Sequence, residues 1–181
     1  MDKKSSYTKQ ELLDIGAGKF FGKNNGKLPL PPMLMMDRIL QISKKGGKYG
    51  NGYIKAELDI DKDQWFFKCH FKNDPVMPGC LGLDGFWQLI GFYLSWAGGT
   101  GKWGALVVKE LKFKGQVRLY HDKTTYIIDI NKFITKPTFM ACVDAVLKVK
   151  DKTIYFAKYL QVGLFEKLVW DSDMDLALDP F

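Results

Sequence analysis

Asp84 is the only charged residue between Asp74 and Lys102. It lies in CLGLDGFWQLIGFYLSWAGG, residues 80–99, a segment that is otherwise uncharged, largely apolar and long enough to form a helix. An ionised carboxylate in such surroundings costs free energy unless another group pairs with it or water reaches it. The position alone therefore supports two interpretations: a general acid in an active site, or a carboxylate that caps the helix or accepts a hydrogen bond from a nearby amide.

His70 is one of two histidines and a candidate general base. Four aromatic residues lie beside it in the sequence: Trp65, Phe66, Phe67 and Phe71. Considered alone, a histidine among aromatic residues is more typical of a packed core. His70 does, however, come just before the loop that leads to Asp84. The other histidine, His121, lies in the polar stretch LYHDKT and is expected at the surface.

The stretch NDPVMPGC, residues 73–80, connects His70 to the apolar segment. Its two prolines stiffen it, and Gly79 directly precedes the expected helix. The first turn of a helix has free backbone N–H groups and a partial positive charge, which can polarise a bound carbonyl group as negative charge builds on its oxygen. Residues 70–84 thus offer a base at His70, an oxyanion site at the helix start and an acid at Asp84. The alternative is an ordinary Pro–Gly helix start.

The cysteines allow two further interpretations. Cys69, His70 and Cys80 match no standard zinc spacing and leave a fourth ligand unidentified, so no metal site is predicted. Cys69 or Cys80 as a nucleophile beside His70 remains open, although adjacent residues in an extended segment point in different directions. Three cysteines, with Cys142 as the third, indicate no disulfide framework. Because no nucleotide-binding glycine motif is present either, no cofactor is expected.

The elements that position these residues follow from the hydrophobic pattern. A short helix is expected over residues 5–15, a loop over 16–32, and a hairpin of two strands over 33–45 and 51–58. After the helix of residues 80–99, four further strands are expected over 103–114, 124–134, 141–149 and 153–163. Short connections between runs of about ten residues favour an antiparallel sheet. The pattern predicts an α+β fold with one long central helix wrapped by an antiparallel β-sheet.

The helix of residues 80–99 is apolar all round, so it is expected to be buried on every side. A transmembrane span is the alternative for a segment of this length. Its acid, its glycines and the absence of a second such segment argue against a span. No membrane span is therefore predicted.

Composition fits one domain covering residues 1–181, because 181 residues with 46% hydrophobic content can form a full core. The net charge of +7 suggests an acidic partner such as nucleic acid, an acidic carrier protein or an anionic thioester, or else serves solubility. No nucleic-acid-binding motif is visible. The first residues, MDKKSSYTKQ, lack an apolar signal sequence, so a cytoplasmic location is expected.

The stretch WFFKCHFKNDPVMPGCLGLDGFWQLIGFYLSW strongly resembles the FabA-type 3-hydroxydecanoyl-acyl-carrier-protein dehydratases. The resemblance extends to MLMMDRI (33–39), GYIKAELDI (52–60), LKFKGQV (111–117) and VGLF (162–165). It implies a hot-dog fold and a homodimer whose site lies at the interface, with His70 of one subunit facing Asp84 of the other. The acidic tail of about residues 167–181 does not resemble the short tail usual in the family.

The resemblance also implies the chemistry, which is elimination of water from a 3-hydroxyacyl thioester. His70 is expected to remove the C2 proton, the Gly79 amide to stabilise the thioester oxygen, and Asp84 to protonate or hold the departing hydroxyl. The family also moves the new double bond from trans-2 to cis-3, at the start of unsaturated fatty acid synthesis. The substrate is carried by acyl carrier protein, for which Lys132 and Lys136 are the expected docking residues. The alternatives are a hot-dog acyl thioesterase and a non-catalytic acyl-thioester-binding module.

Overall fold

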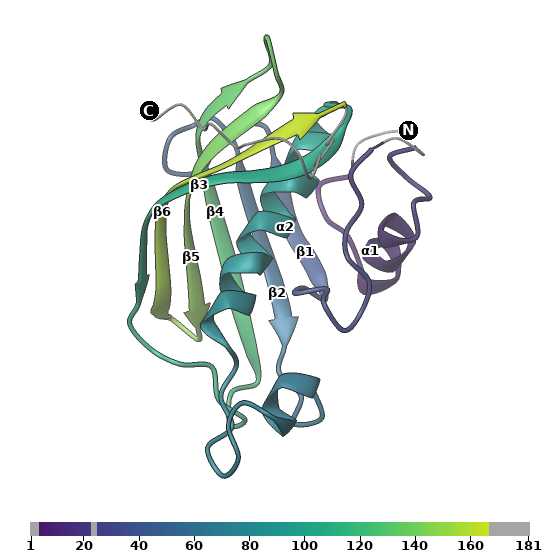
Figure 1. Cartoon of the computed structure of the whole chain (residues 1–181). Coiled ribbons are helices and arrows are strands. Elements are labelled where there is room, and N and C mark those ends of the chain that lie inside the picture. The colour runs from purple at the N-terminus through teal and green to yellow at the C-terminus, as the bar shows by residue number, and fades with distance from the viewer. Residues whose placement is uncertain (1–3, 23–24, 167–181) are drawn as a thin grey trace, which may run out of the picture.

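The computed structural model describes residues 4–22 and 25–166, and the predicted acidic tail of residues 167–181 lies outside them. Its elements are α1 (Lys9–Gly16), β1 (Arg38–Ser43), β2 (Tyr53–Asp59), a 3₁₀ turn (Trp65–Lys68), α2 (Gly79–Ala97), β3 (Lys102–Phe113), β4 (Lys123–Ile134), β5 (Met140–Val149) and β6 (Lys152–Phe165). Within these ranges the strands form one antiparallel sheet in the order β1-β2-β4-β5-β6-β3. The sheet curves around α2 (Figure 1), which confirms the predicted fold class.

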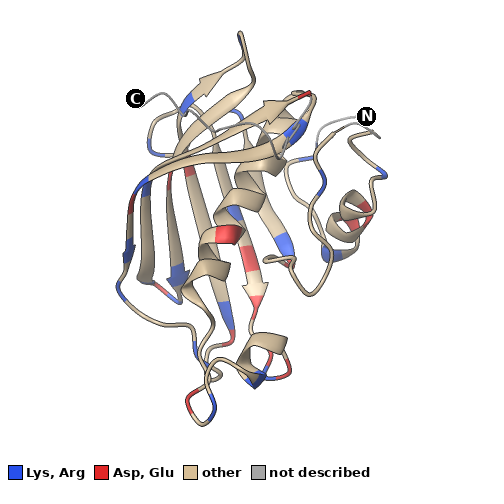
Figure 2. Cartoon of the chain, in the orientation of Figure 1, with Lys and Arg blue, Asp and Glu red and all other residues tan. Residues whose placement is uncertain are grey.

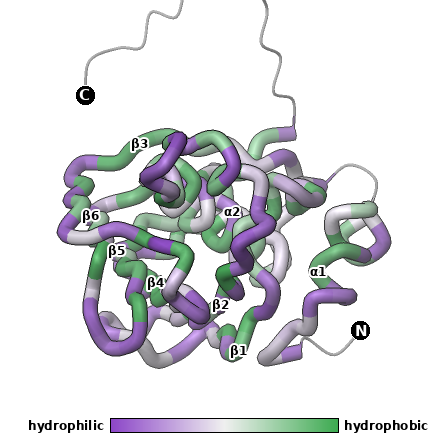
Figure 3. The backbone as a smooth tube through the Cα atoms, turned by 90° about the horizontal axis from the view of Figure 1, so that it is seen from below, coloured by the Kyte–Doolittle hydropathy of each residue, from purple (hydrophilic) through white to green (hydrophobic). Residues whose placement is uncertain are grey.

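The sheet wraps the helix because each strand alternates between two environments. On β4, Thr124, Tyr126, Ile128 and Ile130 are fully buried on the face toward α2, while the residues between them are half-buried. Viewed from below, the strands curve around α2 and leave α1 to one side (Figure 3). The alternation is confirmed over residues 124–130, where it places the core between the sheet and α2, and it ends at the register shift after Ile130.

The helix α2 has the predicted position but not the predicted all-round burial. It ends where Gly98 adopts a left-handed conformation with φ of 108°. Cys80 is exposed, and Leu83, Asp84 and Trp87 are half-buried. These four residues share one face at helical spacing, which we call the open face of α2. Among the described residues no helix is long and apolar enough to cross a membrane, α2 included.

In the part of the chain that the structure describes, one edge of the sheet is covered by a neighbouring segment, and the other is not. Residues before α1 cover the edge at β1, because the backbones of Tyr7 and Ile39 exchange two hydrogen bonds of 2.9 Å. This pairing is why α1 begins at Lys9, after the Thr8 N-cap, and not at the predicted residue 5. The other edge, the 12-residue strand β3, pairs only with β6 within the described chain. Two large apolar residues on β3, Leu106 and Phe113, are exposed.

Strand β1 begins at Arg38, five residues later than predicted. The backbone at Met33 and Met35 is instead hydrogen-bonded to one side chain of α2, the amide of Gln88. The predicted strand over residues 33–45 is therefore wrong at its start, because these groups are satisfied by a side chain rather than by a strand.

Candidate functional site

His70 lies on the irregular segment between the 3₁₀ turn and α2. Its backbone N–H donates to the carbonyl of Phe66 at 2.8 Å, and its carbonyl accepts from the Val76 N–H at 2.7 Å. The ring nitrogen Nδ1 lies 2.9 Å from the Val76 carbonyl oxygen. A carbonyl oxygen only accepts, so Nδ1 carries the proton and Nε2 of the neutral ring has a free lone pair. The geometry thus prepares His70 to accept a proton at Nε2.

The end of the His70 segment is held by the chain that follows β3. Arg118 forms an ion pair with Asp74, and its backbone bridges that of Val76. The Met77 N–H donates to the Val117 carbonyl at 3.0 Å. The carbonyl that fixes the His70 ring is therefore itself anchored to a second part of the fold.

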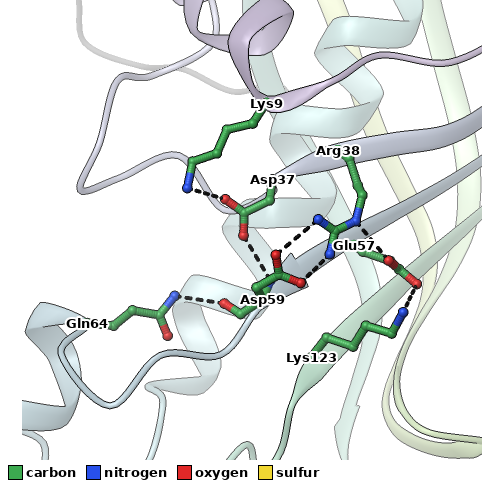
Figure 4. A network of polar contacts seen from close by, with 7 residues as sticks. All are labelled: Lys9, Asp37, Arg38, Glu57, Asp59, Gln64 and Lys123. Carbon is green, nitrogen blue, oxygen red and sulfur yellow. Dashed lines mark hydrogen bonds and ion pairs between the residues drawn. The ribbon is translucent and has the colours of Figure 1, made fainter.

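The start of the segment is held by a polar network on the outer face of the sheet (Figure 4). Gln64 donates to the Asp59 carbonyl at 3.1 Å. The Asp59 carboxylate accepts two hydrogen bonds from Arg38, and Arg38 also donates to Glu57 at 3.0 Å. Lys123 contacts the second oxygen of Glu57 at 2.8 Å. The network ties β1, β2 and β4 to the segment that carries His70.

Glu57 is the most buried carboxylate of this network. Burial raises its pKa, but the hydrogen bonds from Lys123 and Arg38 outweigh burial and hold the pKa below its ordinary value. The network extends to α1 through Asp37, which accepts from the Asp59 N–H at 2.8 Å and contacts Lys9 at 2.8 Å. These carboxylates are satisfied by structural partners, so they are not candidates for catalysis.

Asp84 lies on the open face of α2. Figure 2 shows the α2 ribbon free of charged residues except at one acidic position. One of its carboxylate oxygens accepts a hydrogen bond from Nε2 of Gln88 at 2.6 Å. The same nitrogen donates to the Met33 carbonyl at 2.8 Å, and the Gln88 carbonyl accepts from the Met35 N–H at 3.0 Å. Gln88 is thus fixed on three sides and orients Asp84.

Sequence reasoning missed Gln88. The available signal is its spacing: it lies four residues after Asp84, one helical turn away, and it is the one amide side chain in α2. What the sequence lacks is the distant partner, because the backbone that holds Gln88 is more than 50 residues away.

Gly79 is the first residue of α2, with Pro78 as N-cap. A Cβ at this position would lie 2.8 Å from Cε1 of Phe113, so the ring of Phe113 covers the helix start closely. Gly82 and Gly85 follow on the side of α2 that faces the sheet, and each also receives an aromatic ring. We call these three residues the glycine stripe. The rings that pack on it belong to Phe113, Tyr155 and Tyr126.

The structure does not join the two candidate catalytic side chains within one chain. Among the described residues, no hydrogen bond or ion pair connects His70 with Asp84, although each has its own supporting contacts. His70 is half-buried before the start of α2, and Asp84 is half-buried on the open face.

Lys132 and Lys136 are exposed near the end of β4. The His70 segment lies at the other end of the sheet, next to the start of β4, since the Ile60 N–H donates to the Asp122 carbonyl at 2.9 Å. The 12 residues of β4 separate its two ends by about 35 Å. The connection between β4 and β5 and the His70 segment lie at opposite ends of the molecule in Figure 1.

The cysteine alternatives find little support. Cys69 and Cys80 are exposed, and the Cys69 thiol points back to the carbonyls of Trp65 and Phe66 at 3.6 and 3.7 Å. Within the described ranges, no three side chains of the metal-binding types are grouped together. His121 is half-buried, with Nδ1 accepting from the Arg118 N–H at 3.0 Å.

Comparison with solved structures identifies the fold. The dehydratase heterocomplex ApeI:P from Xenorhabdus doucetiae matches with a TM-score of 0.59 and 10% identity, over 76% of this chain and 88% of that one. The sigma28-regulated virulence protein Cj0977 from Campylobacter jejuni matches with a TM-score of 0.56 and 12% identity, over 79% of this chain and 85% of that one. The TM-scores show a shared fold, the hot-dog fold, and at such low sequence identities the matches show nothing finer.

The sequence match is more specific than the structural one. A model of the FabA-like domain matches residues 28–158, which include His70, Gly79, Asp84 and Gln88. This is well over half of the 181 residues. The chain therefore belongs to the FabA-like domain family.

Proposed function

We propose that this chain is a dehydratase that removes water from 3-hydroxyacyl thioesters. The observation that carries the proposal is the hydrogen bond from His70 Nδ1 to the Val76 carbonyl, which leaves Nε2 free to act as a base. Asp84, held by Gln88, supplies the acid that such an elimination needs. Membership of the FabA-like family and the likeness to a dehydratase heterocomplex support the same reaction.

The reaction takes a simple course with these groups. Nε2 of His70 removes the C2 proton, and the electron pair left on C2 forms the new C2–C3 double bond. The bond from C3 to the hydroxyl breaks, and Asp84 donates the proton that makes this group leave as water. The Gly79 N–H at the start of α2 stabilises negative charge on the thioester oxygen. Carbon is neither oxidised nor reduced overall, so the reaction needs no redox cofactor, and the proposed steps use only these protein groups.

The substrate we propose is 3-hydroxydecanoyl thioester, and the first product is trans-2-decenoyl thioester. The same base also carries the double bond to the cis-3 position, by removing a proton from C4 while C2 is reprotonated. This isomerisation supplies unsaturated fatty acid synthesis. It rests on the family resemblance and on a base that is free to act twice.

The active unit we propose is a homodimer, with His70 of one copy facing Asp84 of the other. Three observations support it: the open face of α2 carries Asp84, the edge strand β3 is unpaired on one side within the described chain, and Leu106 and Phe113 expose apolar surface along that strand. An unpaired apolar edge is a ready surface for pairing with another chain. A second copy would cover these surfaces and complete the site.

We propose acyl carrier protein as the partner that delivers the substrate, with Lys132 and Lys136 as docking residues. Because these lysines lie far from His70 of their own chain, they serve a site only if the second copy places its His70 near them. Lys132→Glu combined with Lys136→Glu should raise KM for the carrier-linked substrate and leave KM for a small-thiol substrate unchanged. An equal rise for both substrates would remove these lysines from the proposal.

Product analysis tests the function directly. Purified protein is incubated with 3-hydroxydecanoyl thioester, and the products are identified by NMR and mass spectrometry while free thiol is measured. We expect trans-2-decenoyl and cis-3-decenoyl thioesters without thiol release, and no product from His70→Ala or Asp84→Asn. Thiol release without dehydration would identify a thioesterase instead. Binding of the thioester without any product would identify a non-catalytic module.

Mixing tests the shared site. Separately, the His70→Ala and Asp84→Asn chains are expected to keep only about a thousandth of the activity, but a mixed dimer contains one site with both residues intact. Co-expressed chains should therefore recover about a quarter of the wild-type activity, since half of the dimers are mixed and half of their sites are complete. No recovery in dimers shown to be mixed would place both residues of a site on one chain.

A further inference from the structure

The inner face of β4 carries two hydroxyl groups with no hydrogen-bond partner. Among the described residues, Thr124 Oγ1 and Tyr126 Oη are the two buried side-chain oxygens in this condition. Both side chains are fully buried. Buried hydroxyls without a partner are unfavourable, because they lose their hydrogen bonds to water. Each such group therefore calls for a structural or functional reason.

The ring of Tyr126 does not explain its hydroxyl. The ring packs edge-on against Phe86, with centroids 5.7 Å apart. A phenylalanine would make the same contact without burying an oxygen. The hydroxyl instead reaches the glycine stripe: a Cβ on Gly85 would lie 2.6 Å from Tyr126 Oη. The hydroxyl therefore lies against the backbone of α2 at Gly85, the residue that follows Asp84.

The surroundings keep this hydroxyl protonated. Burial raises the pKa of Tyr126 above 10.0, and the charges of Tyr155 and Asp84 raise it further. The phenol therefore does not exchange its proton in the range where a histidine base works. It remains a neutral O–H dipole that has no hydrogen-bond partner among the described residues.

We propose that Tyr126 is a positioning residue of the Asp84 side of the site, whose buried O–H dipole stabilises the carboxylate that forms when Asp84 gives up its proton. This inference rests on the proposed dehydration, in which negative charge develops on Asp84 as the hydroxyl leaves. Gln88 fixes the carboxylate by a direct hydrogen bond, and Tyr126 acts on it from the sheet-facing side of α2, where its hydroxyl lies against Gly85.

The substitution Tyr126→Phe tests the proposal, because it removes the hydroxyl and keeps the ring. We expect kcat for dehydration to fall about 10-fold with KM unchanged. The melting temperature should stay the same or rise, since a buried unpartnered oxygen has been removed. Unchanged kcat with a raised melting temperature would show that the hydroxyl has no functional role and would overturn the proposal.

Two matched variants control for the loss of a buried hydroxyl. Tyr93 is also buried and lies on α2, and its hydroxyl is 3.4 Å from the Asn51 carbonyl. Tyr93→Phe should leave kcat unchanged. Thr124→Val removes the other unpartnered oxygen and should leave kcat unchanged while the protein becomes no less stable. An equal fall of kcat in all three variants would mean a general loss of packing, against a specific role for Tyr126.

A spectroscopic measurement separates this inference from the proposed function. The ¹³C carboxyl resonance of Asp84 is assigned in full-length protein by its loss in Asp84→Asn. It should shift in Tyr126→Phe and not in Tyr93→Phe. If the wild-type protein dehydrates nothing but the resonance shifts, the positioning role stands and the proposed reaction falls. A resonance that stays unchanged in Tyr126→Phe overturns the positioning role whatever the activity.

Discussion

His70 and Asp84 are held in place by opposite means. His70 lies on an irregular segment, and a backbone carbonyl, that of Val76, orients its ring. Asp84 lies on a regular helix, and a side chain, that of Gln88, orients its carboxylate. Ion pairs at the surface and a polar network fasten the first arrangement, whereas a buried amide fastens the second.

The two halves of the candidate site are therefore vulnerable in different ways. The support of His70 is spread over several exposed or half-exposed groups, so the loss of one should be tolerated. The support of Asp84 is concentrated in Gln88, whose amide also satisfies buried backbone groups. Loss of Gln88 should therefore damage both activity and stability.

The largest effects should come from the two side chains themselves. His70→Ala and Asp84→Asn should each lower kcat for dehydration by about 10³-fold, because each removes one partner of the proton transfers. Neither group is fully buried, so the free energy of unfolding should change by less than about 1 kcal/mol. Single-turnover kinetics and urea denaturation measure the two quantities. Activity that survives in both variants would mean that neither residue is catalytic.

Gln88→Met should give the next largest effect. It leaves the Met35 N–H buried without an acceptor, which should destabilise the protein by about 2 kcal/mol. It also frees the Asp84 carboxylate, which should lower kcat about 10-fold. Gln10→Met, an exposed amide on α1, is the control and should change neither quantity. If Gln88→Met lowered stability without lowering kcat, its amide would be structural only.

Arg118→Gln tests the more distributed support of His70. It breaks the ion pair with Asp74, whose side chain is 63% exposed, so the loss of stability should stay within about 1 kcal/mol. We expect kcat to fall about threefold, because the segment that carries the Val76 carbonyl loses the side-chain ion pair at Asp74 and keeps only its backbone contacts. Lys19→Gln breaks a comparable surface pair with Asp14 and should leave kcat unchanged. A loss as large as that in Gln88→Met would erase the contrast between the two halves.

The smallest effect concerns acid stability. The folded-state pKa of Glu57 is lowered relative to 4.5, so its carboxylate stabilises the fold above that pH and this contribution is lost as pH falls through the folded-state pKa. Unfolding free energies measured between about pH 6 and about pH 3 should decline less steeply in Glu57→Gln than in the wild type. Glu110→Gln breaks a solvent-accessible pair with Lys112 and should change the slope less than Glu57→Gln, because water screens that pair. Equal slopes in wild type and Glu57→Gln would exclude a role for this network in acid sensitivity.

The sequence was sufficient for the features that depend on local pattern. The alternation of apolar and polar residues predicted the strands, and an uninterrupted apolar run predicted α2. Both patterns arise from burial over a few consecutive residues, so they can be read locally. The pattern failed where distant groups satisfy each other. Residues 33–37 have strand-like composition, but Gln88 takes the hydrogen bonds of Met33 and Met35. Apolar residues on α2 also cannot reveal that one face lies open within a single chain.

The candidate site shows the same division. His70, Gly79 and Asp84 stand out by residue type and by their place in a motif, and these signals are local. Gln88 and Tyr126 do not stand out. An amide in a helix and an aromatic residue on an alternating strand are both ordinary, and their importance depends on contacts across the fold. The docking role of Lys132 and Lys136 remains a prediction.

The glycine stripe sets the distance between α2 and the sheet. Where aliphatic side chains separate a helix from a sheet, small changes are absorbed by their many conformations. Here rigid rings touch helix backbone directly, as at Gly82 and Tyr155. A single added methyl group at Gly82 would have to lift the helix or displace the ring, and Asp84 travels with the helix. The position of the Asp84 carboxylate therefore depends on three glycines. A variant with a larger residue at one of them could keep every reactive group and still misplace Asp84.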